Sequence, residues 1–267
     1  MKNRPIGIFD SGLGGLTVMK AIQKELPQER LVYFGDTARI PYGSKSPDTI
    51  IRYSRQIFRF LLSREKVKVV VVACNTSSAW ALDSMRREFK VPILGVIEPG
   101  AHAAIEVTRN GRIGVIGTEG TIYSGAYPKV IHKFMPKARV VSKPCPLFVP
   151  LVEEGKLTGL VAETVAREYL KPLLEEKIDT LLLGCTHYPL LKKTIHKILG
   201  AKVKIVDSAE ETARALHRNL ETYGVELNGR GSGKYYVSDL SRKFQEHAQR
   251  FLGRHINRVE KIFIERY

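Results

Sequence analysis

Short apolar runs alternate with amphipathic stretches along the whole chain, and this alternation is the feature that most limits the fold. The apolar runs are rich in Val, Ile and Leu, which is typical of buried strands. The stretches between them carry apolar residues at helical spacing. One begins at Ser46 and Pro47, a typical helix start, and places Ile50, Ile57 and Leu61 on one face. The alternation predicts an α/β protein with mostly parallel sheets.

The expected strands also contain a weak internal repeat. They span residues 6–10, 30–36, 67–74, 91–97, 113–118, 138–143, 179–185, 202–207, 234–239 and 261–265. IGIFD and IGVIG each open a segment that later reaches a strand ending in a cysteine, Cys74 or Cys185. We therefore expect two similar α/β domains, residues 98–207 and a discontinuous one made of 1–97 and 208–267. Since the matching stretches are short, a chance match between generic strand and helix patterns is the alternative.

Composition places the chain among ordinary globular proteins. It has 267 residues, 43% hydrophobic and 26% charged, which suffices for a substantial core. No apolar run approaches the roughly 20 residues that cross a bilayer. The first strand begins too early to leave room for a signal peptide. We expect a cytoplasmic protein with no membrane partner.

The net charge of +16 raises the question of nucleic-acid binding. Lys and Arg are spread along the chain, with the densest cluster in residues 254–267, and no nucleic-acid motif accompanies them. We favour a basic surface with a general attraction for anions over a nucleic-acid partner.

The three cysteines are too few for a disulfide scaffold, and no spacing typical of a metal site is present. We expect reduced thiols and no metal. Cys74 and Cys185 each end an apolar strand and precede small polar residues. Cys145 lies between prolines and is expected to be a structural thiol.

In an open parallel sheet, ligands bind beyond the carboxyl ends of the strands, so the residues that close the strands are candidate site residues. They are Asp10, Ser11, Asp36, Cys74, Asn75, Thr76, Thr118, Thr121, Cys185, Thr186 and His187. For Asn75 and Thr76, capping of the following helix is the structural alternative. The turn SGLGG after Asp10 suits an anion, but it is neither a Walker A loop nor a complete dinucleotide fingerprint.

Three more candidates lie away from the strand ends. Tyr42 and Gly43 belong to the loop IPYGSKS, whose N–H groups suit a carboxylate, although a simple turn also explains its Pro and Gly. Glu153, like His187, can titrate and could assist a thiol, although both residue types are more often structural.

Two thiols at equivalent places in two similar domains need a joint explanation. A thiol titrates near 8.5, and a helix N-terminus or nearby donors bring its pKa toward neutrality, so it can act as base or acid. If the domains face each other, one thiolate can remove a proton from one face of a carbon while the other thiol protonates the opposite face. A noncatalytic binding module has no need of such a pair.

Five stretches resemble, in order and spacing, the cofactor-independent glutamate racemases of the aspartate/glutamate racemase superfamily. They are GIFDSGLGGLTV, FGDTARIPYG, ACNTSSA, PLVEEG and LLGCTHYP, and the resemblance runs from residue 7 to about 210. It implies two α/β domains with the active site in the cleft between them, a first domain completed by the C-terminal part, usually a homodimer, and no cofactor.

The same resemblance implies a role for each candidate. Cys74 takes the proton from D-glutamate and Cys185 takes it from L-glutamate. Asp10 and His187 assist the neighbouring thiols and contact the substrate, with Glu153 as a third assisting group. The substrate's amino and carboxylate groups are held by Ser11, Asn75, Thr76 and Thr186, with Thr118 and Thr121 further out. Tyr42 and Gly43 receive the side-chain carboxylate.

The expected function is therefore interconversion of L- and D-glutamate by a two-cysteine mechanism, supplying D-glutamate for peptidoglycan. The close alternative is a racemase for aspartate or another amino acid on the same scaffold, since pocket length decides between them. The distant alternative is a binding module that uses the basic tail.

Overall fold

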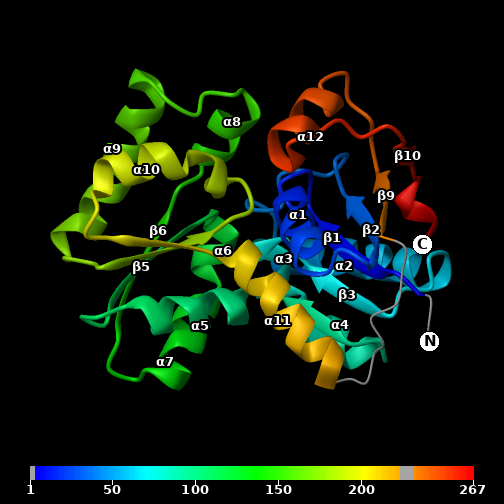
Figure 1. The fold of residues 1–267 in the computed structure, drawn as a ribbon, viewed down its shortest axis with the longest axis horizontal. Helices are drawn as coiled ribbons and strands as arrows, with labels where there is room; N and C mark the ends of the chain where they lie inside the picture. The colour runs from blue at the N-terminus through cyan, green and yellow to red at the C-terminus, as the bar shows by residue number, and fades with distance from the viewer. Residues whose placement is uncertain (1–3, 223–230) are drawn as a thin grey trace. The chain divides into compact units, whose positions relative to one another are not determined.

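The fold is described from a computed structural model, in which residues 4–222 and 231–267 are placed well enough to describe. Strands and helices alternate, and the chain divides into two compact units, Met1–Val96 with Ala209–Tyr267 and Ile97–Ser208 (Figure 1). The junctions lie one residue from those expected from the sequence. The expected class, two similar α/β units with parallel sheets, is confirmed.

The first unit is built on a six-stranded sheet with the order β10-β9-β2-β1-β3-β4, in which every neighbouring pair is parallel. Its strands are β1 (Ile6–Asp10), β2 (Arg30–Gly35), β3 (Val69–Val72), β4 (Ile93–Gly95), β9 (Ser232–Val237) and β10 (Glu260–Lys261). The central strands β1 and β3 are buried along their whole length. This burial explains why they are continuously apolar in the sequence rather than alternating.

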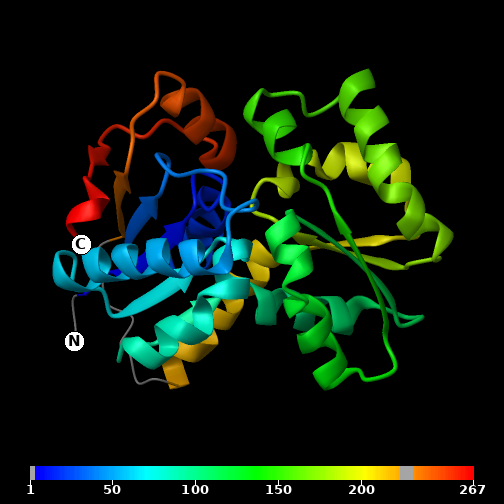
Figure 2. The same ribbon diagram turned by 180° about the vertical axis from the view of Figure 1, so that it is seen from behind.

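Helices cover both faces of this sheet. They are α1 (Leu16–Glu25), α2 (Pro47–Ser63), α3 (Asn75–Trp80), α4 (Leu82–Glu88), α11 (Ser208–Thr222), α12 (Phe244–Leu252) and the 3-10 turn η2 (Ile264–Arg266). Figures 1 and 2, seen from opposite sides, show α1 and α2 on opposite faces. The start of α2 is as expected, because the Ser46 hydroxyl accepts a hydrogen bond from the Thr49 N–H at 3.4 Å and Pro47 occupies the first turn.

The C-terminal part of the chain completes the core of the first unit. Strand β9 pairs with β2 over six residues of each strand. Phe60 on α2 packs edge-on against Tyr236 and Tyr267, with ring centroids 5.1 and 5.2 Å apart. The return of the chain to this unit therefore supplies both backbone pairing and aromatic packing.

The strand expected over 261–265 is wrong beyond Lys261, because β10 spans only Glu260–Lys261. Strand pairing ends after the Ile262 N–H donates to the Val237 carbonyl at 2.8 Å, and the chain then turns into η2. Ile262 and Ile264 are buried while Phe263 is 59% exposed. The alternating pattern is real, but a 3-10 turn satisfies it as well as a strand does.

The second unit has a four-stranded sheet with the order β6-β5-β7-β8, again parallel throughout. Its strands are β5 (Arg112–Gly117), β6 (Arg139–Pro144), β7 (Thr180–Gly184) and β8 (Lys204–Asp207). Its helices are α5 (Ile97–Val107), α6 (Glu119–Tyr123), α7 (Ala126–Phe134), α8 (Phe148–Glu153), α9 (Leu160–Glu175), the 3-10 turn η1 (Tyr188–Leu191) and α10 (Lys192–Leu199). Figure 1 shows α5 and α7 on one side of this sheet and α9 and α10 on the other.

The two sheets share one topology. The order β2-β1-β3-β4 in the first unit corresponds to β6-β5-β7-β8 in the second. Strands β3 and β7 thus occupy equivalent positions; Cys185 is the first residue after β7, and Cys74 is the second residue after β3. The weak sequence repeat therefore reflects a repeated arrangement of strands.

Within residues 4–222 and 231–267, no helix is both long enough and apolar enough to cross a membrane.

Candidate active site

Cys74 joins β3 to α3 and is itself the N-cap of that helix. Its Sγ accepts a hydrogen bond from the Ser77 N–H at 3.5 Å, and its thiol donates to the Ser11 hydroxyl at 3.4 Å. Capping by Asn75 and Thr76, the structural alternative suggested by the sequence, is wrong, because both residues lie in the first turn of α3. β3 ends at Val72, two residues before the expected strand end at Cys74, so the thiol lies between strand and helix and takes the capping position.

Asp10 closes the neighbouring strand β1 and is fully buried. One of its carboxylate oxygens accepts a hydrogen bond from the Gly12 N–H at 3.0 Å. A Cβ atom on Gly15 would lie 2.4 Å from the Asp10 Cβ, so only glycine fits at this point of the SGLGG turn. The turn thus wraps around a carboxylate of the chain itself.

The environment of Cys74 disfavours its thiolate. Burial raises the pKa of Cys74 to about 11, the negative charge of Asp10 adds to this effect, and the hydrogen bonds with Ser11 and Ser77 only partly oppose it. The expectation that a helix N-terminus brings this pKa toward neutrality is therefore wrong. Cys74 carries its proton at neutral pH.

Cys185 follows β7 and belongs to a second cluster. Its Sγ lies 4.0 Å from Nδ1 of His187, and Nε2 of His187 lies 3.2 Å from a carboxylate oxygen of Glu153. Glu153 is the last residue of α8, and His187 is the N-cap of η1. The thiol, the imidazole and the carboxylate therefore form one chain of contacts.

His187 is a cation at neutral pH. Burial lowers its pKa, but the interactions with Cys185 and Glu153 outweigh burial and raise the pKa to about 10. An imidazolium at this distance is the partner that a thiolate needs. The two clusters thus differ in charge, with a carboxylate beside Cys74 and an imidazolium beside Cys185.

Three candidate threonines lie just beyond the strand ends of the second unit. Thr118 follows β5 and caps α6, because its hydroxyl accepts a hydrogen bond from the Thr121 N–H at 3.3 Å. The hydroxyls of Thr118 and Thr121 lie 3.1 Å apart. Thr186 lies between Cys185 and His187 and is buried. Thr118 therefore has a clear structural role in addition to the predicted binding role.

Tyr42 is buried, with its hydroxyl engaged within the first unit. It donates to the carboxylate of Asp36, which also accepts hydrogen bonds from the Ser238 hydroxyl and the Arg39 guanidinium, both at 2.7 Å. Among the described residues, the backbone N–H groups of Tyr42 and Gly43 have no acceptor. Any contact of this loop with a carboxylate would therefore come from backbone N–H groups, as the sequence suggested.

Sequence reasoning missed Tyr33. Its hydroxyl donates to the Gly12 carbonyl at 2.8 Å and so holds the SGLGG turn against β2. A signal was present, because a tyrosine in an otherwise apolar buried strand needs a hydrogen-bond partner. Sequence reasoning also missed Ser77, whose N–H donates to the Cys74 sulfur at 3.5 Å.

Comparison with known proteins identifies the family. Residues 6–216 match the model of the Asp/Glu/Hydantoin racemase family. The chain belongs to this family. It is accordingly an isomerase of a cofactor-independent type.

Relatives cover nearly the whole chain. The glutamate racemase of Geobacter metallireducens is 53% identical over 266 residues, covering 98% of this chain and 97% of the relative. The crystal structure of glutamate racemase from Francisella tularensis in complex with D-glutamate is 39% identical, covers 100% of both chains and has a TM-score of 0.93. The aspartate racemase of Picrophilus torridus, 21% identical over 83% of this chain and 94% of its own, with a TM-score of 0.56, shares the fold alone.

Proposed function

We propose that this isomerase interconverts L- and D-glutamate, with Cys74 and Cys185 as the two proton-transfer groups. The observation that carries the proposal is the pair of thiols at equivalent strand ends, one beside a carboxylate and the other beside an imidazolium. The relative from G. metallireducens, called a glutamate racemase, and the D-glutamate in the F. tularensis structure support the choice of substrate.

In the proposed mechanism both thiols act on the same α-carbon, from opposite faces. For L-glutamate, the Cys185 thiolate takes the α-proton, and the electron pair of the broken C–H bond becomes a planar carbanion. The Cys74 thiol then gives its proton to the other face, which forms D-glutamate and leaves Cys74 as a thiolate. For D-glutamate the same steps run in reverse, and neither sulfur has to move.

The neighbours of each thiol suit this cycle. The His187 imidazolium, oriented by Glu153, stabilises negative charge on Cys185 before the proton is taken. The negative charge of Asp10 makes a Cys74 thiolate strongly basic, so that it readily takes a proton back from D-glutamate. Asp10 thereby assists Cys74 without transferring the proton itself.

The remaining candidates are proposed to hold the substrate. Ser11, Asn75, Thr76 and Thr186, with Thr118 and Thr121 further out, together with Asp10 and His187, contact the amino and α-carboxylate groups. Donors on the α-carboxylate spread the charge of the carbanion, and exclusion of water strengthens those contacts. The N–H groups of Tyr42 and Gly43 receive the side-chain carboxylate, which distinguishes glutamate from shorter acids.

We further propose that the protein works in the cytoplasm as a homodimer and supplies D-glutamate for peptidoglycan. Its net charge of +16 favours the approach of an anionic substrate, although salt screens such attraction beyond about 8–10 Å. Sedimentation velocity at several protein concentrations tests the dimer, and a monomer at every concentration would exclude it.

The decisive experiment is isotope exchange in D2O. Incubation with either glutamate enantiomer should place deuterium at the α-carbon, seen by NMR, while the circular dichroism of the amino acid decays to zero. Aspartate is the matched control, because it has the same groups on a shorter side chain. Exchange with aspartate and none with glutamate would overturn the proposed substrate.

A further inference from the structure

The turn that carries Cys185 and His187 is closed by Tyr188. The Tyr188 N–H donates to the Cys185 carbonyl at 3.2 Å, which forms a tight turn directly after β7. Cys185 opens this turn, and His187 lies inside it. Since the thiol and the imidazole belong to the same short turn, whatever holds Tyr188 in place also holds these two groups.

Tyr188 is joined to the segment that carries Glu153. Its hydroxyl donates to the Cys145 carbonyl at 2.8 Å. The same carbonyl accepts a hydrogen bond from the Phe148 N–H at 3.2 Å, in the turn where α8 begins. The Tyr188 ring packs edge-on against the Phe148 ring, with centroids 5.2 Å apart. One side chain thus links η1 to the start of α8 twice, through a hydrogen bond and through a ring contact.

These contacts are buried, whereas the carboxylate they bear on is not. Tyr188, Phe148 and Cys145 are each 0% exposed, and close packing leaves such groups little freedom to move. The Glu153 side chain is 32% exposed and ends α8, a helix of only six residues. A partly exposed carboxylate at the end of a short helix keeps its place only if the helix is anchored elsewhere. The buried contacts of Tyr188 supply that anchor.

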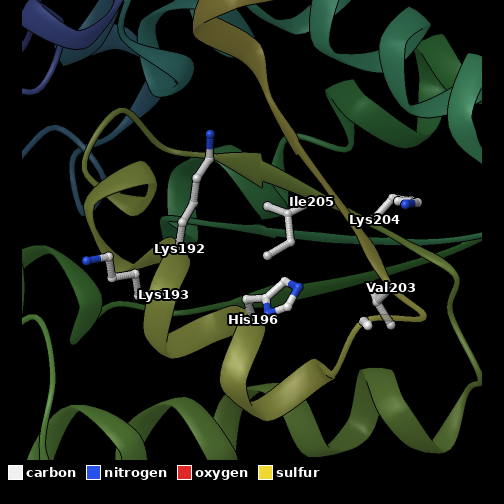
Figure 3. Close-up of a pocket in the computed structure, with 7 residues that line it drawn as sticks. Lys192, Lys193, His196, Val203, Lys204 and Ile205 are labelled. Atoms are coloured by element: carbon white, nitrogen blue, oxygen red, sulfur yellow. The ribbon is translucent and has the colours of Figure 1, made fainter.

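The surface side of the same segment holds it less firmly. Figure 3 shows Lys192 and Lys193, at the start of α10 and directly after η1, extending in different directions beside a surface pocket. Lys192 pairs with Asp207 at an N–O distance of 2.8 Å, but the Lys192 side chain is 41% exposed. Such an exposed ion pair adds little stability. The buried side of the segment, at Tyr188, therefore contributes more to its position.

We propose that Tyr188 is a positioning residue for the His187–Glu153 pair, and through that pair for the Cys185 thiolate. It sets the spacing between η1 and α8, so that Nε2 of His187 stays 3.2 Å from the Glu153 carboxylate. Tyr188 transfers no proton itself, because its hydroxyl is buried and donates to a backbone carbonyl. The role rests on the proposed racemase mechanism, in which a charged His187 stabilises Cys185.

The first test is an NMR titration of His187 in the full-length protein, with the His187→Gln protein to assign its signal. Cys185 at the end of β7 and Glu153 on α8 are the titratable groups that face His187, and they raise its pKa to about 10. Tyr188→Phe keeps the ring and removes the hydroxyl, so that α8 and η1 separate more easily. The contact with Glu153 should weaken, and the pKa of His187 should fall by at least about one unit.

Tyr169→Phe is the matched control, because it removes the same group from the same aromatic cluster. The Tyr169 ring packs edge-on against Phe148, with centroids 5.3 Å apart, and the Tyr169 hydroxyl accepts a hydrogen bond from the Leu147 N–H at 3.4 Å. These contacts join α8 to α9 rather than to η1. The control should therefore leave the pKa of His187 unchanged. Equal shifts in the two variants, or no shift in Tyr188→Phe, would overturn the proposal.

A second readout asks whether Tyr188 acts through His187. Labelling of Cys185 by iodoacetamide should be at least about threefold slower in Tyr188→Phe than in the native protein. The double variant Tyr188→Phe with His187→Gln should be labelled no more slowly than His187→Gln alone, because the group through which the tyrosine acts is gone. Additive slowing would refute the positioning role. Circular dichroism checks that each variant is folded.

Neither readout depends on turnover of glutamate, so the two proposals fail separately. In the racemisation assay, Tyr188→Phe should lower kcat and leave KM nearly unchanged, because the groups proposed to bind the substrate remain. Native protein that exchanges no glutamate proton in D2O would exclude the proposed function, and a shifted pKa of His187 in Tyr188→Phe would still support the positioning of the pair. Normal racemisation by Tyr188→Phe with an unshifted pKa would exclude the positioning role alone.

Discussion

At the scale of single residues, the main result is that two similar thiols lie in opposite electrostatic surroundings. Asp10 and burial keep Cys74 protonated, whereas His187 places a positive charge beside Cys185. A two-base racemase needs one thiol and one thiolate at the start of each turnover. The proposed mechanism uses both features, with Cys74 as the proton donor and a positive charge beside Cys185 when L-glutamate reacts.

Replacement of either thiol by alanine should abolish racemisation. Cys74→Ala and Cys185→Ala each remove one of the two proton-transfer groups, whereas Cys145→Ala should keep most activity. Cys145 is the control because it is fully buried, and its thiol donates to the Lys143 carbonyl at 3.6 Å. The rate is followed by circular dichroism of glutamate. A fully active Cys185→Ala protein would contradict the two-thiol mechanism.

Alkylation should distinguish the thiols. With a pKa of about 11, Cys74 has a thiolate fraction of about one in a thousand at pH 8. Iodoacetamide, which attacks the thiolate, should therefore label Cys185 first, Cys74 slowly and the buried Cys145 last. Peptide mass spectrometry after timed quenching measures this order. His187→Gln should slow labelling of Cys185, and an unchanged rate in that variant would argue against the proposed imidazolium effect.

The charge on His187 predicts a pH dependence of stability. Its pKa is about 10 in the folded protein and 6.5 when unperturbed, so the folded state holds the proton more tightly. The resulting stabilisation is complete below about pH 6.5 and is lost as the pH rises toward 10. The urea midpoint should therefore fall between pH 6.5 and 8.5, a window below the titration of Cys74.

In His187→Gln the fall over the same window should be smaller, because the proton that links stability to pH is gone. A Cys74→Ser protein is the control and should keep the native slope. If His187→Gln and the native protein lose stability in parallel, the raised pKa of His187 is not the cause.

At the scale of elements, the SGLGG turn between β1 and α1 packs closely against the side chain of Asp10, the last residue of β1. Gly15→Ala would place its Cβ 2.4 Å from the Asp10 Cβ, so the turn or the strand end must shift. We expect a loss of about 1–3 kcal/mol in the free energy of unfolding and a lower racemisation rate. Gly12→Ala is the control, since its Cβ would meet only the Ile40 Cγ2, at 3.2 Å. Urea denaturation measures both, and equal losses would contradict the close fit at Gly15.

At the scale of the whole molecule, the first unit depends on the C-terminal part of the chain. Tyr236 is 4% exposed and packs on Phe60, whereas Phe263 is 59% exposed. Tyr236→Ala should therefore destabilise the protein by about 3–5 kcal/mol. Phe263→Ala, the same kind of truncation on the surface, should cost less than about 1 kcal/mol. Urea denaturation compares them, and similar losses would mean that the aromatic packing contributes little.

Much of the fold was predictable, because buried strands and amphipathic helices have different periods in the sequence. The strand 6–10 agrees with β1, and both cysteines were placed at strand ends because the carboxyl ends of parallel strands carry the functional groups. The strand expected over 261–265 is wrong beyond Lys261, because a short irregular segment followed by a 3-10 turn buries Ile262 and Ile264 as a strand would. In a segment this short, the pattern of apolar residues alone does not distinguish a strand from a 3-10 turn.

The sequence by itself determined the layered α/β class, the two thiols and the small polar residues beside them, because these follow from local spacing. Only the tertiary structure decided that Cys74 caps α3 and that Tyr33 holds the SGLGG turn. It also decided the two pKa shifts: burial and Asp10 raise the pKa of Cys74, and the interactions with Cys185 and Glu153 raise the pKa of His187. These properties depend on burial and on distances between groups far apart in the chain, and neither is fixed until the strands have paired.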